Sequence, residues 1–213
     1  ASNYKDPGWA DLESIPGELK QVESLLQGQG FIVEKHLDPD ADELMGLFEE
    51  FIKRYGYDPY NRLLFFYSGH GFTRQEGKKG YLVPVDAPDP YRVELEFLQK
   101  ALPMSQILAW ARQSEAKHSL YLFDSCFSGT IFKTRALADR PLQISRATVQ
   151  PVRQFITAGG AGDTVPAQST FTPVFIDAIA YGYGDLNDDG YISGTELGLY
   201  LQQKVPLHVD QLP

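Results

Sequence analysis

The sequence predicts an α/β fold, in which a mostly parallel central sheet is covered by helices on both faces as a three-layer sandwich. Two apolar runs, residues 63–67 and 120–123, are typical of buried strands, and each ends in a turn of small residues. Helical patterns alternate with strand patterns along the chain, as in parallel sheets. The two runs deliver His70 and Cys126 at their carboxyl ends, where open α/β sheets place their sites.

Local signals define the first elements. Residues 16–18, Pro-Gly-Glu, open a helical pattern that Gly28 and Gly30 end. Residues 31–33 are expected to form a short strand. Residues 38–40, Asp-Pro-Asp, cap a second helix. The apolar inner face of this helix consists of Leu44, Leu47, Phe48, Phe51 and Ile52.

The middle of the chain contains the two strands that carry the candidate chemistry. After the strand that ends before His70, a polar loop over residues 74–79 leads to the apolar run 81–85. A helix is expected over residues 103–114, because its apolar positions recur at helical spacing. The strand that ends before Cys126 follows this helix.

The last third of the chain begins with a change of composition. Residues 130–151 carry two prolines and several basic residues without a clean period, so we expect an exposed connector there. Another strand is predicted over residues 152–157 and a helix over residues 171–183. A Gly/Asp-rich loop and a final helix that ends near Val205 complete the pattern.

Bulk properties fit one globular domain spanning residues 1–213. The chain has 213 residues, of which 43% are hydrophobic and 22% charged, so it can form a sizeable core. Its net charge of −9 argues against a nucleic-acid partner, because binding to phosphates needs a basic surface. No run of about 18 apolar residues is present, so we expect no membrane partner.

Cysteine usage points to a reducing compartment. Cys126 is the only cysteine, and no internal disulfide can form. The first residues do not resemble a signal peptide. We therefore expect a cytoplasmic protein.

Two motifs carry a family resemblance. Residues 67–71 read Tyr-Ser-Gly-His-Gly, and residues 124–129 read Asp-Ser-Cys-Phe-Ser-Gly. In these motifs, their order and their separation, the chain resembles the caspase-like cysteine peptidases of clan CD. The closest resemblance is to the bacterial metacaspase-type branch, which includes the orthocaspases. It runs from about residue 12 to residue 205 and implies the caspase-like version of the α/β sandwich.

The residue types at the two turns suit nucleophilic catalysis. A thiol is mostly protonated near pH 7, and a neighbouring imidazole can remove its proton to give the nucleophilic thiolate. We therefore expect Cys126 to attack and His70 to exchange protons. The resemblance implies that the backbone N–H groups of Gly71 and Cys126 bind the oxyanion. No acidic third member is evident, and the family generally works as a dyad.

Specificity is expected to depend on acidic residues near the nucleophile. Caspases that cleave after aspartate carry glutamine two residues before the cysteine, whereas this chain has Asp124 there, as metacaspases do. Glu18 resembles a second acidic pocket residue, and Asp163 is a further candidate. Two carboxylates can clamp a guanidinium through charge-assisted hydrogen bonds. The expected cleavage is after Arg, with Lys second. The alternatives are that Asp124 only supports its turn and that Glu18 only favours the start of its helix.

The resemblance also implies a role for the connector, residues 130–151. It separates residues 1–129, which resemble the caspase large subunit, from residues 152–213, which resemble the small subunit. We hypothesise that the protein is a zymogen activated by self-cleavage within residues 130–151. The alternative is a plain solvated loop. The candidate sites are Lys133, Arg135, Arg140 and Arg146.

A second site is expected near the carboxyl end of the chain. Residues 185–196 match a 12-residue calcium loop, with oxygen ligands at positions 1, 3, 5, 7, 9 and 12 and glycine at position 6. The alternative is a relic loop that only turns and caps the last helix. Bound Ca²⁺ would be structural or regulatory. The expected ligands are Asp185, Asn187, Asp189, the Tyr191 carbonyl, Ser193 through water, and a bidentate Glu196.

Two other functions stay open. One is a catalytically silent, calcium-binding interaction module on the same fold, and the other is a different thiol hydrolase or separase-like peptidase. The expected partner of an active enzyme is a protein substrate with an exposed Arg or Lys. The family's sheet has strands at both ends that this sequence does not show, so we expect neighbouring sequence. Additional domains or a regulatory subunit are possible partners.

Overall fold

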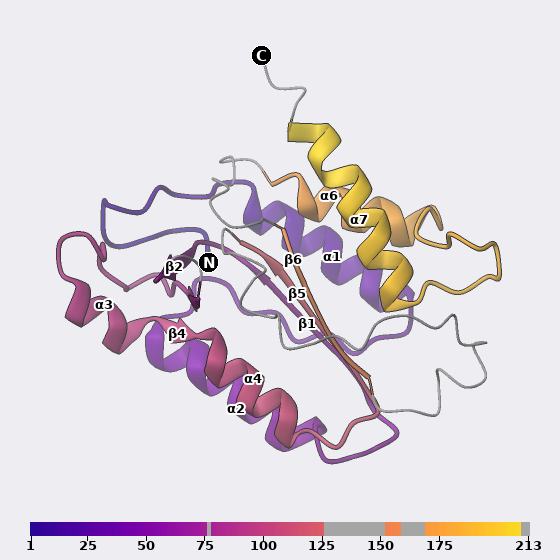
Figure 1. Cartoon of the computed structure of the whole chain (residues 1–213), viewed down its shortest axis with the longest axis horizontal. Helices are drawn as coiled ribbons and strands as arrows, with labels where there is room; N and C mark the ends of the chain where they lie inside the picture. Colours follow the sequence, from indigo (N-terminus) through magenta and orange to yellow (C-terminus); the bar gives the residue numbers. More distant parts are fainter. Residues whose placement is uncertain (76–77, 126–151, 159–168, 210–213) are drawn as a thin grey trace.

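The computed structural model describes residues 1–75, 78–125, 152–158 and 169–209 and has three layers (Figure 1). The central sheet contains β1 (Arg62–Ser68), β5 (His118–Asp124) and β6 (Val152–Thr157), all parallel, in the order β1-β5-β6. Helices α2 (Ala41–Tyr55) and α4 (Met104–Gln113) cover one face. Helices α1 (Ile15–Gly28), α6 (Phe171–Ala180) and α7 (Gly194–Val209) cover the other. This arrangement confirms the fold class predicted from the sequence.

Each face of the sheet has its own apolar core, because successive side chains of a strand point to opposite faces. In β1, Phe65 packs in the core beneath α2 and α4, whereas Phe66 packs against the core beneath α1, α6 and α7. Tyr121 and Leu122 divide β5 in the same way. A central strand buried on both faces needs a continuous apolar run, which explains why these two strands stood out in the sequence.

The first two helices have the expected local causes. Proline lies in the first turn of α1, where its missing N–H costs no hydrogen bond. Asp40 caps α2: its side chain accepts from the Glu43 backbone N–H, and the Glu43 side chain accepts from the Asp40 backbone N–H. Leu44, Phe48 and Ile52 are buried on the inner face of α2, as predicted.

A small antiparallel sheet lies beside the main one. It contains β2 (Gly71–Arg74), β3 (Lys79–Leu82) and β4 (Leu102–Pro103). The sequence indicated only a polar loop over residues 74–79, between β2 and the apolar run that begins in β3. The short helix α3 (Glu94–Lys100) was also not predicted, because a single residue, Phe97, anchors it in the core.

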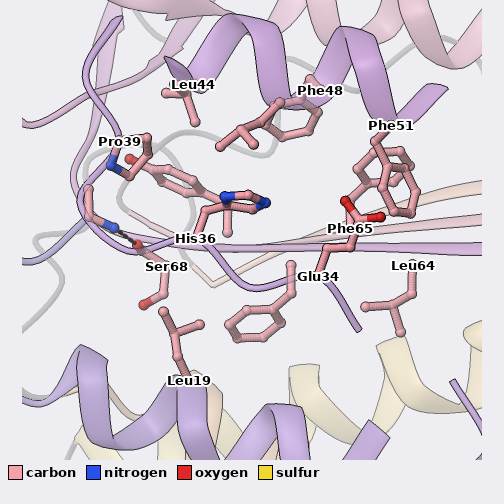
Figure 2. A pocket seen from close by; sticks show the side chains of 14 residues that line it. Leu19, Glu34, His36, Pro39, Leu44, Phe48, Phe51, Leu64, Phe65 and Ser68 are labelled. Atoms are coloured by element: carbon pink, nitrogen blue, oxygen red, sulfur yellow. Dashed lines mark hydrogen bonds between the residues drawn. The ribbon is translucent and has the colours of Figure 1, made fainter. Parts of the chain in front are cut away.

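The strand predicted over residues 31–33 is wrong. This segment forms no strand, and Ile32 is 89% exposed. Next to this segment, a cavity of about 160 Å³ lies between α2, β1 and the residues that include Glu34 and His36 (Figure 2). The backbone of residues 31–33 has no neighbouring strand in the described part of the chain. An extended run without a partner lacks the hydrogen bonds that define a strand.

The carboxyl-terminal elements agree with prediction apart from their ends. Strand β6 was predicted with the observed bounds, whereas α6 ends at Ala180, earlier than expected, and α7 continues to Val209. The predicted connector, residues 130–151, lies outside the described residues. Within the described ranges, no helix has the length and apolar character needed to span a membrane. The expectation of further strands at the sheet edges stays a prediction.

Candidate active site

The turn that carries His70 and the turn that leads to Cys126 are joined at one edge of the sheet. Ser68, the last residue of β1, pairs in register with Asp124, the last residue of β5. The next residue, Gly69, donates its backbone N–H to the Asp124 carbonyl at 3.2 Å. The carboxyl ends of β1 and β5 therefore lie side by side. Cys126 itself lies outside the described residues.

The imidazole of His70 is oriented by the amino-terminal segment. Its Nε2 lies 2.7 Å from the carbonyl oxygen of Ala10. A carbonyl can only accept, so Nε2 carries the proton and Nδ1 is left as the acceptor. Burial lowers the pKa of His70, while the Ala10 hydrogen bond acts in the opposite direction. The ring is therefore neutral near pH 7 and can serve as a base.

Two tyrosine hydroxyls support the backbone of this turn. The His70 N–H donates to the Tyr4 hydroxyl at 2.8 Å, and the Tyr67 hydroxyl donates to the Val83 carbonyl at 2.9 Å. A Cβ atom on Gly69 would lie 2.8 Å from the Tyr67 hydroxyl and 3.0 Å from that of Tyr4. Glycine is needed here because the two hydroxyls approach the backbone so closely. Gly71, the expected oxyanion donor, begins β2 directly after His70.

Asp124 is buried and hydrogen-bonded at the start of α6. It is 4% exposed, and one of its oxygens accepts from the Thr172 hydroxyl at 2.5 Å. The Ser169 hydroxyl donates to the same oxygen. Burial raises the pKa of Asp124, and these hydrogen bonds oppose the rise. The carboxylate therefore does support local structure, as the alternative interpretation required, which does not prevent it from binding a substrate cation.

Asp124 lies close enough to Glu18 to influence the ionisation of Glu18. Burial is the main reason why the pKa of Glu18 is raised, a hydrogen bond with Ser14 opposes the rise, and the charge of Asp124 adds to it. The Glu18 Oε2 atom is buried without a hydrogen-bond partner in the described structure. Two of the three expected pocket acids are thus brought together. The third, Asp163, lies outside the described residues.

The predicted calcium loop follows α6 and turns as the pattern requires. The Asp185 carboxylate accepts from the backbone N–H groups of Asp189, at 3.2 Å, and Gly190, at 2.8 Å. Asn187 also accepts from the Asp189 N–H, at 3.0 Å. Gly190, at position 6, has a φ of 85°, in the left-handed region that favours glycine.

The end of this loop also caps α7. The Glu196 N–H donates to the Ser193 hydroxyl at 3.2 Å, and the Ser193 N–H donates to Glu196 Oε2 at 2.9 Å. The other carboxylate oxygen of Glu196 is buried without a partner. No three Asp, Glu, His or Cys side chains in the described ranges converge as a metal site. Helix capping is therefore a definite role of Glu196, and one of its oxygens stays available.

All four proposed cleavage positions, Lys133, Arg135, Arg140 and Arg146, lie outside the described residues. Arg153, the next basic residue, lies in β6 and is already engaged. Its guanidinium donates to the Ala111 carbonyl at 2.5 Å and also to the Ser114 carbonyl, both at the end of α4. Arg153 therefore caps the carboxyl end of α4.

Sequence reasoning missed the residues that surround His70. Tyr4, Trp9 and Ala10 lie about 60 residues earlier in the chain, and no periodic pattern links them to the histidine motif. It also missed Ser169 and Thr172 as the partners of Asp124. Hydroxyl residues around the start of a helix indicate a cap, but they do not reveal which carboxylate they bind.

Comparison with known proteins agrees with this geometry. The family model for the caspase domain, Peptidase C14, matches residues 1–185. Mucosa-associated lymphoid tissue lymphoma translocation protein 1 of Homo sapiens is 29% identical over 109 residues. The homologue from Mus musculus matches equally well. Each alignment covers 51% of this chain but only 12% of the relative. The chain therefore belongs to the caspase-domain family of cysteine peptidases.

Proposed function

We propose that this chain is a cysteine endopeptidase that cleaves after Arg or Lys with a Cys126–His70 dyad. The observation that carries the proposal is the pairing of the two turns. The Gly69 N–H donates a hydrogen bond to the Asp124 carbonyl. Gly69 directly precedes His70 in the sequence, and Asp124 precedes Cys126 by two positions. Consecutive Cα atoms are 3.8 Å apart, so Cys126 lies within roughly 8 Å of the Asp124 Cα atom. Chain connectivity thus supports a dyad in which the Cys126 thiol meets the His70 imidazole.

The geometry of His70 supports a simple reaction sequence. Nδ1 takes the thiol proton of Cys126, because Nε2 is bound to the Ala10 carbonyl. The thiolate attacks the scissile carbonyl carbon, and the backbone N–H groups of Gly71 and Cys126 bind the oxyanion. The imidazolium then gives its proton to the departing amine. Water, deprotonated by the same imidazole, hydrolyses the thioester and restores the thiol.

The acid pair supports a basic side chain before the cut bond. The charge of Asp124 contributes to the raised pKa of Glu18, and a Glu18 oxygen is buried without a partner in the described structure. Neither carboxylate has an ion-pair partner in the described part of the chain. Paired carboxylates without a cation repel each other and pay for desolvation, whereas a guanidinium or ammonium would relieve both costs.

A panel of fluorogenic peptides that differ only before the cut bond tests the proposal. We expect hydrolysis of Arg and Lys peptides and none of Asp peptides. Activity should disappear in Cys126→Ala, which is the control for a contaminating peptidase. Preference for Asp would overturn the specificity. A wild-type protein that neither hydrolyses any peptide nor is labelled at Cys126 by an arginyl electrophile would favour the silent interaction module instead.

We also propose that the loop at residues 185–196 binds Ca²⁺. The turn geometry and the partnerless oxygen of Glu196 support it, while the reciprocal cap with Ser193 supports the purely structural alternative. Oxygen donors of this kind match the preference of Ca²⁺. The proposed ligands are Asp185, Asn187, Asp189, the Tyr191 carbonyl, Ser193 and Glu196.

A further inference from the structure

We infer that Trp9 is a positioning residue that holds the His70 imidazole on the Ala10 carbonyl, ready to exchange protons at Nδ1. The inference rests on the proposed function for its kinetic consequences. Its structural part, the contact between indole and imidazole, can be tested without any activity. No family motif of the sequence includes Trp9, and the residue lies one position before the carbonyl that binds His70.

The imidazole lies in a notch between two aromatic rings. Its centroid is 5.2 Å from that of Trp9 and 4.7 Å from that of Tyr4, and the Trp9 and Tyr4 centroids are 6.4 Å apart. The imidazole therefore contacts both rings at once. Rotation about its Cβ–Cγ bond would break the hydrogen bond with Ala10 and collide with one of these neighbours. Separations in this range are typical of favourable aromatic pairs.

Trp9 can orient the histidine because it is held rigidly itself. Its Nε1 donates to the Ala87 carbonyl at 3.1 Å. Its ring packs against Phe97, at a centroid distance of 6.1 Å, and Phe72, at 6.4 Å. Arg92 and Asp6 form an ion pair that ties the same amino-terminal segment to the loop before α3. The indole is thus fixed to the small antiparallel sheet and its helix.

The same contact controls the protonation of the imidazole. Burial, to which the indole contributes, is the largest influence on the pKa of His70 and lowers it. The charged groups that face the ring are the amino group of Ala1, which lowers the pKa, and Asp11, which raises it. Loss of Trp9 would expose the ring to water and raise its pKa towards the ordinary value of about 6.5.

Fluorescence gives a test that is independent of activity. The chain has two tryptophans, so Trp110→Phe leaves Trp9 as the only tryptophan, which can be excited selectively over the tyrosines. A protonated imidazole in contact with an indole quenches its emission. We expect the emission of the Trp110→Phe protein to fall on acidification with the pKa of His70, and this step to be absent when His70→Gln is added. If the pH dependence of Trp9 emission is the same with and without His70→Gln, the inference is overturned, even in an active peptidase.

Kinetics test the positioning role. Because small misplacements of a catalytic group are costly, we expect Trp9→Ala to lower kcat about 10–100-fold with little change in KM. The acid limb of its kcat/KM profile should move to higher pH, and Trp9→Phe should recover part of the loss. Trp110→Phe, a change in the core between α2 and α4, serves as the control for stability. A Trp9 variant whose profile and kcat match those of the control would contradict the role.

If Trp9→Ala does not fold, Trp9→Phe carries the same test, because it keeps a ring but loses the Ala87 bond. An unchanged kcat and pH profile in Trp9→Phe would then count against positioning. A wild type without peptidase activity would refute the proposed function, whereas the fluorescence result would stand on its own.

Discussion

At the scale of single residues, Glu18 and Asp124 set the character of the candidate pocket. A buried carboxylate usually has hydrogen-bond partners that compensate for the water it loses. Asp124 has them in Ser169 and Thr172, whereas one Glu18 oxygen has none in the described structure. The two acids therefore differ: removal of Asp124 would disturb the start of α6, but removal of the Glu18 charge would relieve a cost.

This difference leads to a prediction for Glu18→Gln. We expect kcat/KM for Arg peptides to fall about tenfold, equivalent to ~1.4 kcal/mol, because one member of the clamp is lost. The free energy of unfolding should stay equal or rise, because the desolvation cost of the partly buried Glu18 charge disappears. Glu13→Gln, an exposed acid on the same segment, is the control. A loss of stability without a change in Arg preference would assign Glu18 to the fold alone.

The raised pKa of Glu18 also makes substrate binding depend on pH. A carboxyl group whose pKa lies above its ordinary value of about 4.3 is still partly protonated in mild acid. KM for Arg peptides should therefore fall as pH rises through this raised pKa, and Glu18→Gln should remove that limb. Measurement of KM from mild acid to neutrality checks this. The same limb in the variant would exclude Glu18 as its source.

Gly69 gives a prediction about stability. A Cβ atom at this position would press on two buried tyrosine hydroxyls, so Gly69→Ala should cost about 1–3 kcal/mol of unfolding free energy. It should also lower activity, because His70 is the next residue. The matched control is Gly46→Ala in α2, where a Cβ meets nothing within 4 Å and should stabilise the helix by ~0.5–1 kcal/mol. Chemical denaturation of the two variants compares them directly, and equal effects would contradict the close approach.

At the scale of elements, the sequence predicted those with strong repeating signals. β1 and β5 were evident because both of their faces are buried, and α2 because an acidic cap precedes its apolar stripe. β2 and the start of β3 were missed because each strand is only four residues long and the polar residues Thr73, Arg74 and Lys79 lie where the two strands are joined. Residues 31–33 had the composition of a strand, but composition cannot supply the neighbour that a strand needs.

The loop before α7 is an element with two possible roles, and calcium separates them. If it binds Ca²⁺, addition of the ion should raise the Tm and a chelator should lower it, because the ligand binds only the folded state. Asp185→Asn should abolish this shift. Asp188→Asn, at position 4 of the pattern and not a ligand, should retain it. If calcium does not change the Tm of the wild type, the only remaining role of the loop is the helix cap formed by Ser193 and Glu196.

At the scale of the whole molecule, the candidate site combines parts that the sequence could and could not predict. The motifs around His70 and Cys126 were recognisable because each follows its strand directly. The contacts of Tyr4, Trp9 and Ala10 with His70 were not, because they arise only when the amino-terminal segment folds back over the end of the sheet. Long-range packing of this kind leaves no periodic trace in a sequence.

The halves on either side of the connector share one core. β5 pairs with β6 over six residue pairs, from His118↔Val152 to Phe123↔Thr157. Beneath the sheet, residues that precede the connector, such as Val22 and Leu122, pack in the same cluster as Phe175 and Leu201, which follow it. A cut between residues 130 and 151 would therefore leave most of the apolar burial that holds the fold together intact.

We therefore predict that self-cleavage, if it occurs, gives two fragments that stay associated. Wild-type protein should separate into two bands on a denaturing gel but elute as one species of about 23.9 kDa in gel filtration. Cys126→Ala should remain a single chain. Replacement of Lys133, Arg135, Arg140 and Arg146 by Gln should also keep the chain intact while preserving Cys126 and His70. Full activity in that uncut variant would show that cleavage is not required for activation, and a fragment that elutes alone would contradict the shared core.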